Sequence, residues 1–453
     1  MSGLFASLSM AARSLEAQRA GLDVAGQNIA NLNTPGYTRR RLDLAEVVYG
    51  AGGVEVVGTR ALRDRVLDTR VRTAIPDLSR EGALVDTLAL VETAIGAPGQ
   101  GIDGRLASFF DAFSALSVDP ASAAARDGVI LQGTQLASAF NQTASQLADS
   151  VRLADTGVRD AVQQVNRLSK HIAALNDALA AANGANVEAL KDQQATAIEE
   201  LSGLTAVSVL SRADGGVDVT IPSGRALVIG GSTYDVTVGN SPAGLATLSL
   251  GGATITSEVT SGRIGGLLYA RDTLIPGYQA RLDELAFGVA QEVNALHQAG
   301  FDLNGAAGTP FFTPPAVVAG AAAGLAVSGA IQGNPSLVAA SQTGAPGDNQ
   351  VALAIAALRS QPVLAGGTAS FTEGWAQLAY RVGSDADGAR TEQGSRRDVL
   401  GQVERLRDQV SGVSLDEEAA SMLKFQRAYE ANAKYFTAVD DMLQTLMRTV
   451  GGQ

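Results

Sequence analysis

The chain of 453 residues contains no cysteine and only two histidines, His171 and His297. The lack of cysteine excludes disulfides, thiol redox chemistry and thiolate-bound metals, although a chain without disulfides fits either a cytosolic or a secreted protein. Two histidines are too few for a metal cage built from several imidazoles of one chain. The sequence therefore predicts no metal site of these kinds.

Basic residues are in the minority, and long apolar runs are missing. With 34 Lys and Arg against 46 Asp and Glu, the formal net charge is −12. Because a protein that coats duplex nucleic acid needs a basic face, we expect no nucleic-acid partner.

The longest mild apolar run, 316–331, is mainly Ala and Gly and is too short to span a bilayer, so we expect no membrane insertion. Residues 1–20 lack the uninterrupted apolar stretch of a cleavable secretory signal.

Both ends of the chain carry a heptad repeat of apolar residues. The repeat near the start comprises Leu4, Leu8, Ala11, Leu15, Leu22, Ala25, Ile29 and Leu32, with Gln18 as its polar member. The repeat near the end comprises Leu415, Met422, Phe425, Tyr429, Phe436, Val439, Leu443, Leu446 and Val450, with Glu418 and Asn432 as polar members. Such repeats predict a coiled coil. The later stripe is wider than a seam between two helices, which favours burial on more than one side.

The middle of the chain is predicted to be a helical body with an inserted β segment. Apolar residues recur at helical spacing in 158–179, 187–201, 278–296, 371–382 and 399–410, whereas 204–260 is rich in Gly, Val, Thr and Ile with alternating apolar positions. We therefore expect a mainly α, elongated multidomain subunit with a small antiparallel β domain. The expected parts are a terminal coiled-coil domain (1–38 and 412–453), a mainly helical body (39–203 and 262–411, loop-rich at 301–345) and the β domain (204–261).

None of the short motifs predicts catalysis or a cofactor. Residues 99–104 match G-x-G-x-x-G, but a helical pattern precedes them where a dinucleotide fold needs a strand. Residues 302–305 resemble the start of a calcium loop without its later ligands, which favours a turn. His297 lies on a helix without a nucleophile at a recognisable spacing, so we interpret it as a structural histidine. Glu417 and Glu418 lie near the start of a predicted helix, where negative charge complements the helix dipole. The three consecutive arginines at 39–41 predict a solvated or interfacial charge cluster.

One segment is specific enough to indicate a family. Residues 26–41, GQNIANLNTPGYTRRR, resemble the N-terminal signature of the bacterial flagellar rod, hook and hook-associated proteins. Residues 101–120, 261–312 and 411–447 are also similar to members of this family. The form of the last segment, with Ser411-Gly412-Val413 before Asp416-Glu417-Glu418, favours members at the hook–filament junction over the hook protein.

The resemblance implies a structural, non-enzymatic subunit without a cofactor. It implies a helical homo-oligomer between hook and filament that is required for filament assembly and motility. The implied partners are the hook protein, a second junction protein (hook-associated protein 3), filament subunits and an export chaperone. It also implies export by the flagellar type III apparatus, so that the protein is transiently cytoplasmic and then extracellular. A hook or rod protein, a cytosolic coiled-coil interaction protein and an enzyme are the alternatives.

The expected assembly interface consists of the two terminal stripes and the turn that follows the first helix. We further hypothesise that these ends are loose in the free monomer and become ordered on assembly, because Gly21 and Gly26 weaken the first helix. The interface residues are Leu4, Leu8, Leu15, Leu22, Ile29, Leu32, Asn33, Pro35, Gly36, Tyr37, Leu415, Met422, Phe425, Tyr429, Phe436, Val439, Leu443 and Leu446.

Overall fold

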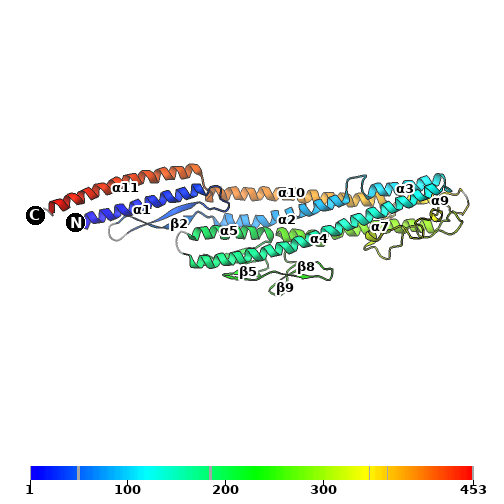
Figure 1. The fold of residues 1–453 in the computed structure, drawn as a ribbon, viewed down its shortest axis with the longest axis horizontal. Coiled ribbons are helices and arrows are strands. Elements are labelled where there is room, and N and C mark those ends of the chain that lie inside the picture. The colour runs from blue at the N-terminus through cyan, green and yellow to red at the C-terminus, as the bar shows by residue number, and fades with distance from the viewer. Residues whose placement is uncertain (1, 48–51, 183–185, 346, 365, 451–453) are drawn as a thin grey trace.

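The computed structural model describes residues 2–47, 52–182, 186–345, 347–364 and 366–450. Residues 1 and 451–453 of the expected terminal domain lie outside these described residues. The molecule is elongated, and its long helices run along its length (Figure 1). At one end α1 (Ser2–Ala30) packs against α11 (Leu415–Val450). The predicted fold class, mainly α with small antiparallel sheets and paired terminal helices, is confirmed.

The body is built from helices of very different length. The helices are α2 (Arg65–Ile95), α3 (Ile102–Val118), α4 (Ala123–Ala181), α5 (Val187–Leu204), α6 (Gly262–Tyr269), α7 (Ile275–Gln298), α8 (Ala321–Gly324), α9 (Gln350–Ala357) and α10 (Phe371–Ser411), with a π-helix η2 (Ala270–Leu274) and a 3₁₀ helix η3 (Pro335–Leu337). Local signals mark two of the starts. The Asp64 carboxylate accepts from the first backbone N–H groups of α2, and Ser370 and Glu373 form a capping box at α10.

The strands form one hairpin and two small sheets. The hairpin of β1 (Arg40–Glu46) and β2 (Val54–Ala61) is antiparallel and packs on α1. The sequence analysis missed this hairpin, although 54–57 (Val-Glu-Val-Val) has the β-branched content of a strand. The other strands, all antiparallel, are β3 (Ser208–Ser211), β4 (Val217–Thr220), β5 (Ala226–Ile229) and β6 (Ser232–Thr233) in one sheet, and β7 (Thr237–Asn240), β8 (Ala246–Leu250) and β9 (Ala253–Thr254) in the other.

Two hydrophobic clusters hold the body together. One joins α3, α7, α9 and the first halves of α4 and α10, and at its centre Phe109, Phe113, Phe311 and Phe312 meet mostly edge to face. The other joins the second half of α4, α5 and α6 to the small sheets. Because α4 contributes to both clusters, this single helix connects the two ends of the body. In the described residues, no helix is long and apolar enough to cross a membrane.

Asparagine side chains repeatedly join a helix to extended backbone. The Asn176 amide on α4 donates to the Val217 carbonyl (2.8 Å), and its Oδ1 accepts from the Val217 N–H (2.9 Å). Asn166 holds Val236 in the same way, and Asn294 on α7 holds Phe312. Each amide thus satisfies both polar groups of one peptide residue, as a neighbouring strand would. Asn166 and Asn176 thereby fasten the small sheets to α4.

Candidate assembly interface and its junction with the body

The terminal helices α1 and α11 run antiparallel, so both termini lie at the same tip of the molecule (Figure 1). On α1 the buried positions, apart from Val24, are small or polar. They are Ala11, Ala17, Gly21, Val24, Ala25 and Asn28. At Gly21 the two helices approach so closely that an added Cβ would lie 2.6 Å from carbon atoms of the Phe425 ring. Small residues on α1 therefore provide the holes into which large side chains of α11 pack.

The predicted interface residues divide into two groups on α11. Val439 and Leu443 are buried against α1, and Phe425, Phe436 and Leu446 are half-buried beside them. In contrast, Leu415 (52% exposed), Met422 (38%) and Tyr429 (40%) remain largely exposed. The heptad pattern located both groups, but it did not separate the side chains that pair within the chain from those that remain open.

On α1 the predicted large residues flank the contact with α11 instead of filling it. These are Leu4, Leu8, Leu15, Leu22 and Ile29, and all of them are half-buried, as is Leu32 just after the helix. The contact is rotated by about one residue from the expected positions, because Gly21 and Asn28 are buried where Leu22 and Ile29 were expected. Close approach through small residues explains this rotation, since bulky residues at the same positions would push the helices apart.

An apolar surface remains uncovered on α11 after the pair has formed. Its large exposed side chains are Leu415, Met422, Leu423, Tyr429, Tyr435, Met442 and Met447, and Phe5 on α1 adds a further aromatic ring. At about 100° per residue these positions lie on several sides of α11, and large exposed apolar side chains of this kind are typical of surfaces that another protein covers. We call these eight residues the outer stripe.

The predicted turn after α1 connects the helix pair to the body. Asn33 and Pro35 are exposed, and the backbone N–H of Thr34 donates to the Asn31 carbonyl (2.9 Å). Gly36 has a φ of 76°, and a Cβ there would lie 2.3 Å from Oγ1 of Thr196 on α5. Both the left-handed conformation and the close contact require glycine at this position. The turn therefore fixes the direction in which the chain leaves α1.

Asn28 is the centre of the junction, and the sequence analysis did not single it out. Its side chain is 1% exposed, and its amide joins three segments of the chain. Nδ2 donates to the Arg40 carbonyl (2.8 Å) and to the Glu418 carboxylate (3.0 Å). Oδ1 accepts from the Arg40 N–H (2.9 Å) and from the Tyr37 hydroxyl (2.8 Å). Because all four bonds are made by one buried amide, α1, the turn, β1 and α11 are held in one arrangement.

Charged side chains surround Asn28 and complete this junction. Glu418 is only 3% exposed, and the Arg39 guanidinium lies 2.7 Å from its carboxylate. Burial raises the pKa of Tyr37 above its ordinary value, although the charge of Arg40 opposes this, so its hydroxyl remains a donor. The sequence did contain a signal for Asn28: Glu418 is a charged residue at a predicted seam position of the heptad repeat, and a buried carboxylate there needs a polar partner on α1.

A second group of charges attaches the junction to α5. Asp192 on α5 accepts from Arg63 (2.5 Å) and lies 3.4 Å from Arg40. The three residues of the predicted arginine cluster have different environments. Arg39 binds α11, Arg40 binds α5, and Arg41 is exposed. Two of the three arginines thus connect β1 or its start to other segments of the chain, which agrees with the interfacial and not the solvated interpretation.

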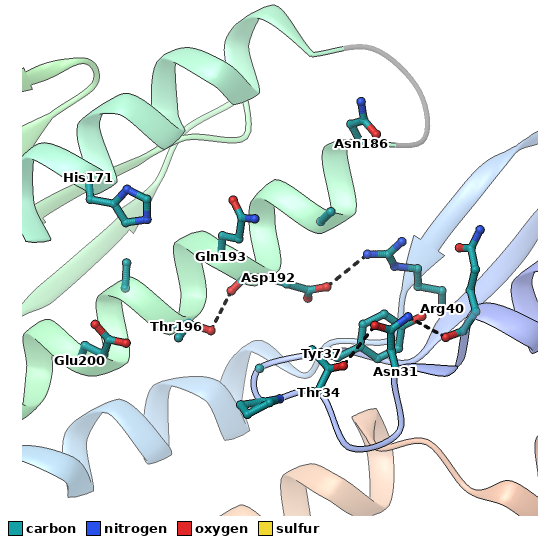
Figure 2. A pocket seen from close by; sticks show the side chains of 15 residues that line it. Asn31, Thr34, Tyr37, Arg40, His171, Asn186, Asp192, Gln193, Thr196 and Glu200 are labelled. Atoms are coloured by element: carbon teal, nitrogen blue, oxygen red, sulfur yellow. Dashed lines mark hydrogen bonds and ion pairs between the residues drawn. The ribbon is translucent and has the colours of Figure 1, made fainter. Parts of the chain in front are cut away.

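A cavity of about 670 Å³ lies between the turn and the helices α4 and α5 (Figure 2). Thr34, Tyr37 and Arg40 line one side of it, and His171 and Glu200 line the other. No nucleophile paired with a base is present among these five residues, which is the arrangement that covalent catalysis needs. Among the described residues, no group of three or more His, Cys, Asp or Glu is placed to hold a metal ion.

The other candidate motifs have structural roles. Asp302 accepts from the backbone N–H groups of Asn304 and Ala306, which makes 302–306 a closed turn. Asp103, in the first turn of α3, accepts from the backbone N–H of Gly99 in the loop that follows α2 and from that of Gly104. His297 is fully buried with both ring nitrogens in hydrogen bonds, as expected for a structural histidine.

Family models match three segments of the chain. The model described as "Flagellar hook-associated protein FlgK helical domain" matches residues 88–312. The terminal segments match "Flagella basal body rod protein" at residues 8–38 and "Flagellar basal body rod FlgEFG protein C-terminal" at residues 408–449. The last two matches include most of α1 and α11, so the helices of the candidate interface resemble the ends of rod proteins.

Relatives with curated names are similar along the whole chain. Flagellar hook-associated protein 1 of Bacillus subtilis is 28% identical over 100% of this chain and 99% of its own length. The Escherichia coli protein of the same name is 24% identical over 96% of this chain and 97% of its length. The solved structure of the flagellar hook junction protein FlgK from Burkholderia pseudomallei matches 75% of this chain with a TM-score of 0.67 and 17% identity. At that identity the structural match shows the fold alone.

Proposed function

Because the chain belongs to the family of flagellar hook-associated protein 1, we propose that it polymerises at the junction between the flagellar hook and the filament. It is a structural component of the bacterial flagellum. In the proposal it acts as an adaptor on which the filament is assembled, so that motility depends on it. The observation that supports this most directly is the similarity to proteins of that name over the full length of the chain.

The outer stripe supports assembly by packing. Met422, Tyr429 and Met442 are each about half exposed in the single chain. Burying a large apolar side chain fully contributes about 1.5–3 kcal/mol, so half-exposed residues contribute about 1 kcal/mol each when a neighbour covers them. Several such residues on each copy give several kcal/mol per contact. Repeated around a helical homo-oligomer, such contacts would contribute to holding a polymer together by packing alone.

The predicted residues take different roles in this proposal. Val439, Leu443 and their neighbours hold α11 on α1, and the outer stripe, with Leu415, Met422 and Tyr429, contacts other subunits. Asn33, Pro35, Gly36 and Tyr37 set the angle at which the chain leaves the helix pair.

The proposed partners follow the position between hook and filament. We expect the hook protein on one side of the polymer, and hook-associated protein 3 and filament subunits on the other. An export chaperone would bind the chain during its transient stay in the cytoplasm, before the flagellar type III apparatus secretes it to the extracellular flagellum. A chain without cysteine suits export in an unfolded form, because it has no disulfide to reduce.

A hook or rod protein is the second candidate, and the terminal segments favour it. The flagellar basal-body rod protein FlgG of Agrobacterium fabrum is 33% identical over 21% of this chain and 37% of its own length. Since this match is short while the junction proteins match the whole chain, we prefer the junction.

Electron microscopy of flagella from a strain that lacks the gene separates the two candidates. We expect hooks without filaments, and restoration of filaments by the wild-type gene on a plasmid. Absent hooks would favour a hook or rod protein, and normal filaments would contradict both proposals.

A further inference from the structure

Two contacts define the register in which α1 and α11 pair. Nδ2 of Asn28 donates to the Glu418 carboxylate (3.0 Å), and a Cβ at Gly21 would lie 2.6 Å from carbon atoms of the Phe425 ring. On each helix the two contacts are one heptad apart, and they advance in opposite directions, as an antiparallel pair requires. Both contacts therefore belong to one register. We call the first of them, between Asn28 and Glu418, the polar layer.

The same register continues toward the two termini. At further steps of one heptad, Ser14 falls opposite Asn432 and Ser7 falls opposite Val439. Val439 is buried and the other three are half-buried, as expected for residues inside the pair. Outside the polar layer, each of these positions thus combines a small residue of α1 with a larger residue of α11.

The apolar repeat alone also allows a shifted register. If α11 were displaced by one heptad, Val439 would lie opposite Ser14 and Leu446 opposite Ser7. Large apolar side chains would again cover small residues of α1, and the first two turns of α11 would leave the pair. A pattern that repeats every heptad cannot by itself distinguish two registers that differ by one heptad.

The polar layer does distinguish them. In the shifted register Phe425 would cover the Asn28 amide, and the Glu418 carboxylate would lose the hydrogen bond from that amide. The two side chains are 1% and 3% exposed, and burying a polar group without its partner is unfavourable. A displacement in the opposite direction would bring Ser411 to Asn28, but the Ser411 carbonyl at the end of α10 already accepts from the Arg39 N–H (2.9 Å).

We propose that the polar layer determines the register of the helix pair, because it excludes the shifted register that the apolar residues allow. A single polar contact within an apolar seam has this effect in coiled coils. The outer stripe lies mostly on α11, so a shift of one heptad would move it by about 10 Å along α1. The polar layer thus gives every copy of the chain the same outer surface. The inference concerns the single chain and does not depend on the proposed function.

Disulfide formation distinguishes the two registers, because the chain contains no cysteine of its own. Ser7→Cys with Val439→Cys reports the native register, and Ser14→Cys with Val439→Cys reports the shifted one. The two reporters differ only at the position on α1. A disulfide does not bridge Cα atoms more than about 7 Å apart, so each register closes only its own reporter. Diamide oxidises the dilute purified protein, and the disulfide formed within single chains is measured.

The decisive variant removes the polar layer. In the otherwise unchanged chain we expect the native reporter to close, and the shifted reporter to form at least tenfold less disulfide. Asn28→Ala with Glu418→Ala leaves a small residue at position 28 for Phe425 to cover, so the shifted reporter should close at least tenfold more than before. The matched control, Asp192→Ala, removes the carboxylate that attaches the junction to α5 but keeps the polar layer. It should retain the native pattern.

Several results would overturn the inference. One is an unchanged pattern in the variant without the polar layer. Another is closure of the shifted reporter in Asp192→Ala, since loosening of the junction would then be sufficient. If neither reporter closed in the variant without the polar layer, that layer would be needed for pairing itself and not for the choice of register. Failure of the native reporter to close in the otherwise unchanged chain would remove the register on which the inference is based.

Discussion

Acidification should destabilise the body of the protein through one buried histidine. His297 on α7 is 0% exposed and is hydrogen-bonded at both ring nitrogens. Nδ1 lies 2.5 Å from the Thr309 carbonyl and Nε2 lies 2.8 Å from the Ala339 N–H. The backbone N–H can only donate, so Nε2 must accept and the ring must be neutral, with its proton on Nδ1. Protonation would place two donors against each other at Ala339.

The pKa of His297 gives the magnitude of the effect. The pKa falls from its ordinary value of 6.5 to about 4, chiefly because burial disfavours the imidazolium. The contact with Thr309 opposes this change, and the positive charge of Arg126 adds to it. The unfolded chain therefore binds more protons than the folded chain between pH 6.5 and about pH 4. Stability is complete above pH 6.5 and decreases as the pH falls through this window, by about 3 kcal/mol in total.

Urea unfolding of the wild type and of His297→Gln between pH 7 and pH 4.5 measures this contribution. We expect the variant to be less stable at pH 7 but to lose less stability on acidification, so that the difference between the two proteins narrows as the pH falls. His171→Gln, which removes the other, exposed histidine, should have the wild-type pH profile. If the free energies of unfolding of the wild type and of His297→Gln fell in parallel as the pH is lowered, the reasoning would be refuted.

Three further predictions concern the terminal helices. Leu443→Asp places a carboxylate on the buried side of α11, at a cost of several kcal/mol to the helix pair. The body should stay folded by circular dichroism while incorporation into flagella is lost, and motile cells would show that the assignment of this contact is wrong. Asn28→Asp removes both Nδ2 donations and sets a carboxylate 3.0 Å from that of Glu418. Limited proteolysis within 31–41 should therefore become faster, and an unchanged cleavage rate would contradict the role of Asn28. If the ends order only on assembly, amide exchange in a verified monomer should be fast at 4–32 and 415–450, and strong protection there would reject that hypothesis.

The sequence was sufficient for the periodic elements of the fold. Apolar residues spaced three or four apart predicted the second half of α4 and the helices α5, α7 and α10, because such spacing places them on one face of a helix. The β1–β2 hairpin was not predicted. Its strands bury little of either face, since most positions of β1 are exposed, and the alternating pattern that reveals a strand is therefore weak.

The pairing of the terminal helices was predicted, and its details depend on contacts between distant residues. A heptad pattern reports that Phe425 and Tyr429 are both apolar, but not that Gly21 makes room for the first while the second is left exposed. Asn28 was missed for the same reason. Its importance comes from Arg40, Tyr37 and Glu418, and one of these is 390 positions away along the chain.

The antiparallel pairing of α1 with α11 has a consequence for the time order of biosynthesis. The ribosome makes α1 before α11, and contacts such as that between Gly21 and Phe425 join segments that are separated by the whole body of the protein. The partner of α1 does not exist until the body has been translated. While the body is being made, α1 is therefore available to any cellular factor that recognises it, before its native partner can compete.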